Sequence, residues 1–157
     1  MADKHSKEYP LPRFHFQVDW GADFHIGFTE VTGLSFETEV IEYREGNSPQ
    51  YIKRKQAGMQ KLTNVTAKRG VFKGDDDLYK EFAKTVYFQE GNKPGSLYRR
   101  TVTISLLDET HQPIIVWKLQ NAWLSKVQSP DLKADASEVA IETMEIVHEG
   151  LSVEFVK

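Results

Sequence analysis

The chain has 157 residues, of which 39% are hydrophobic and 27% charged, a composition typical of one soluble globular domain. Its net charge of -3 gives no general attraction to nucleic acids or acidic membranes, and the absence of cysteine excludes disulfides and thiolate catalysis. Residues 1–10 lack an apolar signal region and no run of about 18 apolar residues occurs, so we expect neither a signal peptide nor membrane insertion.

The N-terminal part predicts a mobile arm followed by a hairpin. Residues 1–9 are polar, and apolar residues then alternate with polar ones from Arg13 to Trp20, which predicts a half-buried strand. The next strand carries its apolar residues on one face. A three-residue loop at 21–23 puts both apolar faces on the same side, whereas a two-residue turn would not. The expected pairs are Trp20 with Phe24, Val18 with Ile26 and Phe16 with Phe28.

A third strand is expected from Leu34 to about Arg44, and its apolar pattern changes parity along the way. Ile41 and Tyr43 are apolar on the opposite parity from the first half, which predicts a bulge or a bend between two packing environments. Residues 45–60 are rich in Gly, Pro, Ser and Gln and are expected to form a long loop, a kind of segment that is usually functional or disordered. The side chains expected in the core are Leu34, Phe36, Thr38 and Val40.

The remaining pattern predicts a mainly β fold with one helix. The helix is expected at about 76–88, because Asp75, Asp76 and Asp77 provide a cap and first-turn acids, and Leu78, Phe82 and Val86 share one face. Further strands are expected at 61–69, 98–107, 114–124, 138–147 and 151–156. Seven or eight antiparallel strands predict a two-sheet β-sandwich or small barrel with an external helix, in one domain spanning residues 1–157.

No pattern indicates catalysis. The five histidines have no metal-ligand spacing, and no phosphate-binding loop or nucleophile elbow occurs, so we expect no enzyme, metal or cofactor. Glu37 and Glu39 share a strand face, but a solvated polar face explains them better than a glycosidase pair. The predicted hairpin puts His25 opposite Asp19, which we interpret as a structural pair.

Two surface features suggest assembly instead. The basic residues Lys53, Arg54 and Lys55 are too few to indicate nucleic-acid binding, and we hypothesise that they meet acidic residues of another subunit. The non-core faces of several strands are small or charged, which is typical of a solvated antiparallel sheet and would also suit a hydrophilic channel.

The ordered segments resemble one protein family over residues 10–155. They are FHFQVDW at 14–20, GFTEVTGL at 27–34, EVIEYREG at 39–46, AGMQK at 57–61, LTNVTAKRG at 62–70, YRRTVTISLLDE at 98–109, WKLQNAW at 117–123 and EVAIETMEIVHEGL at 138–151. In this order and spacing they resemble the inner-tube proteins of contractile injection systems. Among these they look most similar to the tubes of extracellular phage-derived particles.

The resemblance implies six-membered rings of this chain, with sheets joined edge to edge around a hydrophilic lumen, stacked into a rigid tube. The implied partners are further copies, a contractile sheath protein, baseplate and tube-terminating proteins, and cargo in the lumen. It implies lumen-facing residues at Glu37, Glu39, Asn64, Thr66, Lys68, Thr101, Thr103 and Ser105. It implies subunit or ring contacts at Ile41, Tyr43, Arg44, Glu45, Gly46, Tyr51, Lys53, Arg54, Lys55 and Met59. It implies a sheath-facing helix with Asp76, Asp77, Lys80, Glu81 and Lys84.

Two alternatives stay open at this point. The secreted ring protein of type VI secretion shares the implied fold, although the YREG segment at 43–46 favours the phage-tail-like branch. A small β-barrel binding protein or enzyme fits the composition but would need a convergent polar pocket. The family further implies synthesis in a bacterial cytoplasm and a place in a phage tail-like particle that is released from the cell.

Overall fold

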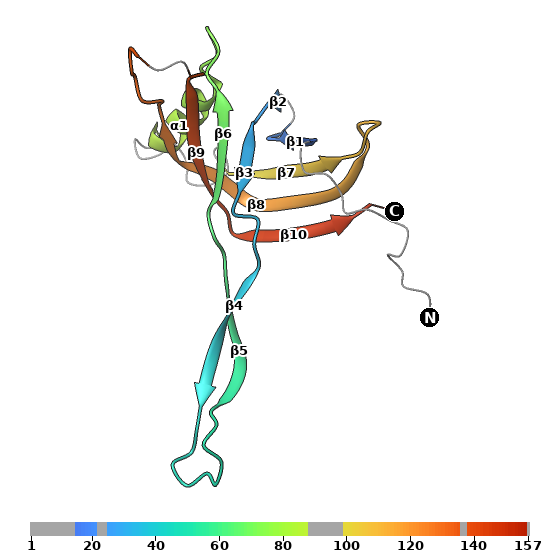
Figure 1. The fold of residues 1–157 in the computed structure, drawn as a ribbon, viewed down its shortest axis with the longest axis vertical. Helices are drawn as coiled ribbons and strands as arrows, with labels where there is room; N and C mark the ends of the chain where they lie inside the picture. The colour runs from blue at the N-terminus through green and yellow to red at the C-terminus, as the bar shows by residue number, and fades with distance from the viewer. Residues whose placement is uncertain (1–14, 22–24, 88–98, 136–137, 157) are drawn as a thin grey trace.

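The computed structural model describes residues 15–21, 25–87, 99–135 and 138–156, with the backbone alone at 25–26 and 84–87 (Figure 1). The expected arm at 1–9, the expected strand start at 13–14 and Phe24 lie outside this part of the chain. Within it, ten strands and one helix form, against the seven or eight strands expected. Their bounds are β1 Phe16–Asp19, β2 His25–Ile26, β3 Glu30–Thr32, β4 Glu37–Tyr43, β5 Arg54–Lys61, β6 Val65–Gly70, α1 Asp77–Tyr87, β7 Arg100–Leu107, β8 Pro113–Gln128, β9 Ile141–Val147 and β10 Gly150–Phe155.

Eight of the strands form one antiparallel sheet that folds over into two layers. Its order is β2-β1-β7-β8-β9-β6-β3, and β10 also pairs with β8. The first part of β8 pairs with β7 and β10, and its last part pairs with β9. Register shifts, including one between Leu124 and Lys126, mark bulges that bend this strand from one layer into the other. Figure 1 shows β6 and β9 of one layer crossing the strands β7 and β10 of the other, so the expected antiparallel β-sandwich is confirmed.

The core lies between the two layers and follows strict alternation along the strands. In β6, Val65 and Ala67 are buried while their neighbours are partly exposed, and β9 shows the same pattern at Met144 and Ile146. A buried aliphatic side chain of this size contributes about 1.5–3 kcal/mol to folding. The buried cluster joins both layers through Val18, Trp20, Val102, Ile104, Leu119 and Leu124.

The first hairpin has the expected register. Val18 lies opposite Ile26 and Asp19 opposite His25, while the expected loop at 21–23 and the pair of Trp20 with Phe24 involve residues outside the described part of the chain. Asp19 Oδ1 accepts a hydrogen bond from the backbone N–H of Gly21 at 3.0 Å, and Gly21 has a φ of +132° that favours glycine. The expected pairing of Val18 with Ile26, and of Asp19 with His25, is therefore confirmed.

The helix α1 also agrees with the sequence. It begins at Asp77, whose N–H donates to Asp75 Oδ1 at 3.4 Å, and it is described as far as Tyr87, since the expected last residue, Phe88, lies outside the described part of the chain. Leu78 is buried in the common core and Phe82 packs against it. The Tyr79 hydroxyl lies 2.7 Å from Ser129 Oγ, at the end of β8. The helix thus closes one end of the sandwich.

A buried ion network fixes the chain at the start of this helix. Arg69 on β6 lies opposite Glu142 on β9, and its Nε donates to Glu142 Oε1 at 2.5 Å, with both side chains almost completely buried. Arg69 Nη2 is also 3.2 Å from Asp75 Oδ1, and this contact lowers the pKa of Asp75. A buried charge without its partner lowers the stability of the fold. Removal of Arg69, Glu142 or Asp75 is therefore expected to destabilise the protein through the partners that remain.

The largest difference from expectation lies between residues 34 and 61. The strand expected from Leu34 to about Arg44 appears as the shorter β4, with β3 as a separate strand before it, and β5 occupies the end of the segment expected to be a loop at 45–60. Phe36 and Val40, expected in the core, are 51% and 60% exposed. The sequence RKQAGMQK of β5 has few apolar residues and a glycine, which is why the sequence pattern predicts a loop. Pairing with β4 satisfies the hydrogen bonds of its backbone N–H and C=O groups.

Candidate assembly surface

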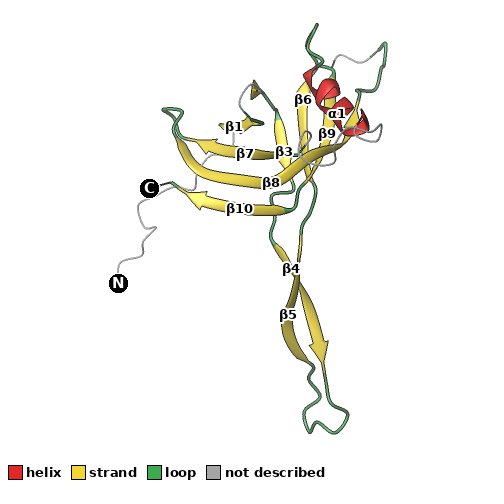
Figure 2. Cartoon of the chain, turned by 180° about the vertical axis from the view of Figure 1, so that it is seen from behind, coloured by secondary structure: helices red, strands yellow, loops and turns green. Residues whose placement is uncertain are grey.

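The strands β4 and β5 form an arm that projects from the body of the molecule. They pair only with each other, and every residue of β4 is exposed. Figures 1 and 2 show the arm extending along the long axis, away from the sandwich. A two-stranded hairpin is at best marginally stable in water when nothing packs on it. We call residues 37–61 the arm and the remaining described residues the body.

The arm continues a strand pair of the body without a change of register. In the body, Glu30 of β3 lies opposite Lys68 and Thr32 opposite Thr66. In the arm, Glu37 lies opposite Lys61, which keeps the same offset between partners. One long ribbon therefore begins beside β9 and leaves the body after residue 32.

The junction between body and arm is tightly packed. Gly33 has a φ of +93°, and a Cβ at this position would lie 2.4 Å from the Asn64 carbonyl oxygen. Across the ribbon, Ser35 Oγ and Thr63 Oγ1 are 2.7 Å apart, and the Thr63 carbonyl oxygen is 2.9 Å from the buried His148 ring. Glycine is required at position 33 because the two backbones approach closely there.

The expected change of parity appears as a bulge, slightly displaced. The register shifts between Thr38 and Val40, where two residues of β5, Gly58 and Met59, lie opposite Glu39. The bulge therefore precedes Ile41 and its extra residue is on the partner strand. Beyond it, Ile41 and Tyr43 are 52% and 59% exposed, so neither is buried within its own subunit.

The arm carries an unusual amount of exposed apolar surface. Soluble monomers seldom expose contiguous apolar patches of this kind, and such patches mark interaction surfaces. The sequence analysis did not identify three of these side chains as contact residues. Phe36 and Val40 fit the alternation of a core strand, and Ile52 stands in a polar segment. The exposed side chains are Phe36, immediately before the arm, and Val40, Ile41, Tyr43, Tyr51, Ile52 and Met59 on the arm.

The outer part of the arm, residues 43–55, is held by its own contacts. Arg44 Nε donates to the Gln50 carbonyl oxygen at 3.3 Å, and its guanidinium lies 5.8 Å from the centre of the Tyr51 ring. Lys53 Nζ is 3.3 Å from Glu42 Oε2. All ten residues expected at subunit contacts lie on the arm and are exposed. The structure thus brings this predicted set together.

The residues expected to face a lumen are placed on three separate surfaces. Glu37 and Glu39 are on the arm. Thr66 and Lys68 lie on the outward face of β6, and Asn64 precedes it with its amide donating to Glu145 Oε1 at 2.5 Å. The third group is on the outward face of β7, which two strands separate from β6. It consists of Thr101, Thr103 and Ser105.

Of the residues expected on the outer face of the helix, three are exposed and one is buried. Asp76 and Lys80 are exposed and form an i,i+4 pair at 3.2 Å, and Asp77 is exposed beside them. Glu81 is only 6% exposed and accepts a hydrogen bond from Arg100 Nε at 2.7 Å, so it faces the fold and not the surface. The side chain of Lys84 lies outside the described part.

Open strand edges accompany the arm. β9 and β10 follow each other along β8, with Val147 opposite Trp123 and Gly150 opposite Gln120. β6 pairs with β9 and β3 but does not continue alongside β10, because the chain leaves the body as the arm at that point. Among the described strands, β10 therefore pairs only with β8 and β3 only with β6. Unpaired edges of this kind readily accept another strand.

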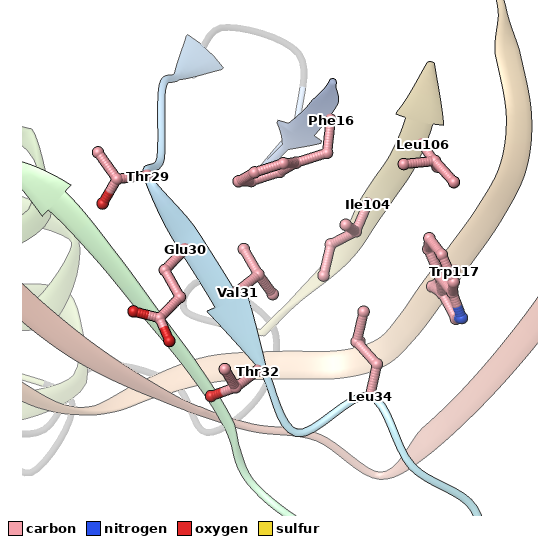
Figure 3. Close-up of a pocket in the computed structure, with 9 residues that line it drawn as sticks. All are labelled: Phe16, Thr29, Glu30, Val31, Thr32, Leu34, Ile104, Leu106 and Trp117. Atoms are coloured by element: carbon pink, nitrogen blue, oxygen red, sulfur yellow. The ribbon is translucent and has the colours of Figure 1, made fainter. Parts of the chain in front are cut away.

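A groove of about 620 Å³ opens between the two layers beside the base of the arm (Figure 3). Phe16, Val31, Ile104 and Trp117 point into it, and Leu34 lies at its lower side. Its acid, Glu30, lies 3.6 Å from Lys68 Nζ. Since enzyme and ligand sites have several convergent polar groups, this groove does not resemble one. In the part of the chain that the structure describes, no three metal-ligating side chains gather.

No helix of the described residues is long and apolar enough to cross a membrane. A search among curated proteins found no match. Solved structures match over nearly the whole chain. A chain in the structure of the anti-feeding prophage cap, which terminates the tube, is 25% identical, with a TM-score of 0.80 and 99% of this chain and 97% of that chain covered. A chain of the extended sheath-tube complex of the extracellular contractile injection system PVC is 25% identical, with a TM-score of 0.79 and 99% of both chains covered.

The type VI alternative is less similar. Hcp1 from Flavobacterium johnsoniae is 10% identical, with a TM-score of 0.50 and 91% of this chain and 97% of that chain covered, a likeness that shows the fold alone. The family model of the T4-like virus tail tube protein gp19 matches residues 12–152. With this match, the projecting arm and the open edges, the chain belongs to the T4-like tail tube gp19 family and is a structural tube subunit of a contractile injection system.

Proposed function

We propose that this chain assembles with itself into six-membered rings, which stack into a rigid tube around a hydrophilic channel. The observation that carries the proposal is the arm, whose apolar side chains stay more than half exposed in the described subunit. A subunit that exposes this much apolar surface gains stability from association. The open edges of β3 and β10 supply a second reason, because neighbours joined edge to edge would satisfy them.

The lining of the channel is proposed from the polar outward faces of the body. Thr103 lies opposite Lys118 and Asp19 in its layer, and Thr66 lies opposite Glu145 and Thr32 in the other layer. A wall of such side chains stays hydrated and holds cargo weakly, so that cargo can leave. For Glu37 and Glu39 the same role requires the arm of one subunit to reach the channel wall.

The partners of the assembled tube are proposed from the same similarity. We place the contractile sheath against the exposed face of α1, which includes Asp76, Asp77 and Lys80. Baseplate and terminating proteins would cover the two ends of the tube. Synthesis in a bacterial cytoplasm followed by release within a phage tail-like particle fits this arrangement.

The alternative of a small β-barrel binding protein would need the groove of Figure 3 to hold a ligand. The groove opens along its side and its lining is largely apolar, so it offers little to orient a small molecule. The geometry supports assembly better.

Electron microscopy of the negatively stained, concentrated protein tests the proposal. We expect rings, with or without stacking, and a matched variant that lacks the arm, with residues 37–61 replaced by a short Asn-Gly turn, should stay folded but form no rings. Sedimentation gives the mass in solution for both proteins. A wild-type chain that stays monomeric at all concentrations and salt conditions would refute the proposed function.

A further inference from the structure

The two strands of the ribbon lose their regular pairing where the ribbon leaves the body. Residues 33–36, between β3 and β4, and residues 62–64, between β5 and β6, belong to no strand. Figure 2 shows this junction as loop between the sandwich and the arm. Since the ladder is interrupted on both strands, backbone pairing alone does not fix the direction of the arm relative to the body.

His148 contacts the junction from the side of the body. Its Nε2 lies 2.9 Å from the carbonyl oxygen of Thr63, in the middle of residues 62–64. A carbonyl oxygen can only accept, so the ring nitrogen donates. His148 is only 6% exposed, and its Nδ1 has no hydrogen-bond partner among the described residues. Because the ring is shielded from water, its N–H depends on this carbonyl oxygen, and the bond restrains both groups.

The position of His148 follows from the register of β6 and β9. Val65 lies opposite Ile146, and the same offset extended by two residues puts Thr63 opposite His148. β9 ends at Val147, so no backbone ladder reaches this position. A side-chain donor thus replaces the backbone bond at the point where the ladder stops.

The backbone of His148 is itself bound to β8 on both sides. The residue before it pairs with Trp123, and the N–H of Glu149 donates to the Gln120 carbonyl oxygen at 2.9 Å. Both partners belong to the strand that bends from one layer into the other. His148 is therefore a fixed point of the body, whereas Thr63 belongs to the unpaired junction.

Other contacts at the junction restrain the arm less. Asn64 Nδ2 donates to Glu145 Oε1 at 2.5 Å, but this bond is exposed and water competes for both partners. The bond between Ser35 and Thr63 joins the two strands of the ribbon to each other and not to the body. Leu34 packs against the core from the other strand and leaves the ribbon free to pivot about that contact.

We infer that His148 is a positioning residue, which sets the direction of the arm by its hydrogen bond to the Thr63 carbonyl oxygen. The inference concerns the geometry of one subunit, and its consequence for assembly rests on the proposed function. From residue 35 to residue 45 an extended strand spans about 33 Å. A rotation of about 10° at the base would move the outer part of the arm by about 6 Å, more than the spacing of about 4.8 Å between paired strands. A subunit with a loose junction would therefore present its exposed apolar residues in the wrong place.

Pulsed electron spin resonance on this cysteine-free chain tests the inference. Gln56→Cys and Lys118→Cys place one spin label on the arm and one on the outward face of β8, both at exposed positions. Sedimentation first establishes a concentration at which the labelled chain is monomeric. We expect a narrow distribution of distances between the two labels, and one that is about twofold broader when His148→Leu removes the donor.

Two amide variants separate the hydrogen bond from the mere loss of the ring. The amide nitrogen of His148→Gln reaches the place of Nε2 and can donate to Thr63, so the distribution should stay narrow. His148→Asn carries the same amide on a shorter side chain and should broaden the distribution as His148→Leu does. Equal widths for the glutamine and asparagine variants would overturn the inference, and so would a narrow distribution with His148→Leu.

Two further variants test other causes of a loose arm. Asn64→Ala removes the exposed bond to Glu145 and should broaden the distribution less than His148→Leu does. Leu119→Ala removes a completely buried core side chain and should leave the width unchanged although it destabilises the body. A larger broadening with Asn64→Ala than with His148→Leu, or an equal one with Leu119→Ala, would overturn the inference.

Electron microscopy of the unlabelled variants separates the inference from the proposed function. We expect rings from wild type and from His148→Gln, and about tenfold fewer from His148→Leu, because only a fraction of its arms then has the required direction. A broad distribution with His148→Leu, together with a wild-type chain that forms no rings, would support the positioning role and contradict the six-membered rings. Equal ring formation by His148→Leu and wild type would overturn the consequence for assembly.

Discussion

The arm and the body are built from one continuous ribbon, yet they use their side chains in opposite ways. In the body, alternate residues of β6 are buried because β9 and the second layer lie beside it. In the arm, all residues of β4 are exposed although the pairing keeps the same offset across the junction, as far as the bulge after Thr38. Backbone pairing therefore does not decide burial, which depends on what packs against the ribbon. The apolar residues of the arm add little to the folding of their own subunit.

The largest expected difference in stability between the body and the arm comes from their ion pairs. Arg69→Ala should lower the free energy of unfolding by about 3–5 kcal/mol, because it leaves Glu142 buried without a partner. Lys53→Ala removes the exposed pair with Glu42 in the arm and should cost less than about 1 kcal/mol. Urea unfolding followed by circular dichroism measures both. Replacing Arg69 and Glu142 together by methionine and leucine should cost less than Arg69→Ala alone, and an equal or larger cost would contradict the mechanism.

Truncation of apolar side chains gives the second test. Leu119→Ala should cost about 2–5 kcal/mol, because Leu119 is completely buried between the layers. Met59→Ala on the arm should change the monomer's stability by less than about 0.5 kcal/mol. Thermal unfolding at a concentration too low for assembly measures the difference. Similar losses for the two variants would show that the arm packs on its own subunit.

Substitution of Gly33 and Gly46 by alanine compares the stability of the junction with that of the outer part of the arm. Gly33→Ala should cost about 1–3 kcal/mol, since its positive φ and the nearby Asn64 carbonyl oxygen leave no room for a Cβ. Gly46→Ala should be nearly neutral, because a Cβ there meets nothing within 4 Å. Differential scanning calorimetry of both variants is the measurement, and the idea fails if their unfolding temperatures agree.

The smallest expected effect concerns acid. The contact with Arg69 lowers the pKa of Asp75 in the folded state, so its contribution is complete above the ordinary aspartate pKa and is lost as the pH falls through the folded value. Asp75→Asn should therefore reduce the loss of stability on acidification. Urea midpoints measured between neutral pH and about pH 3 test this, with Asp135→Asn at an exposed position as the control. Parallel pH profiles for wild type and Asp75→Asn would contradict it.

Hydrophobic faces and turn chemistry were sufficient to predict several elements. The register of the first hairpin follows from matching Val18 with Ile26, and the start of α1 follows from the aspartates before Leu78. The helix start depends on residues that are neighbours in the sequence, and the hairpin register depends on one pair of adjacent strands. Both kinds of information are present in a single sequence.

The arm could not be separated from the core in this way. Phe36 and Val40 fit the alternation of a core strand, because a strand that packs on another molecule has the same pattern as one that packs on its own sheet. A signal did exist for the buried ion pair. Arg69 shares the parity of Val65 and Ala67, and Glu142 that of Met144, so two opposite charges in core positions could have been matched.

The shared offset of the ribbon makes the length of the arm independent of the body. Inserting two residues into each of β4 and β5 would keep every later side chain on its original face, because strand side chains alternate with a period of two. Each such insertion would lengthen the reach by about 7 Å without moving a residue of the sandwich. If copies meet through their arms, the spacing between them is a dimension that evolution, or an engineer, can set two residues at a time.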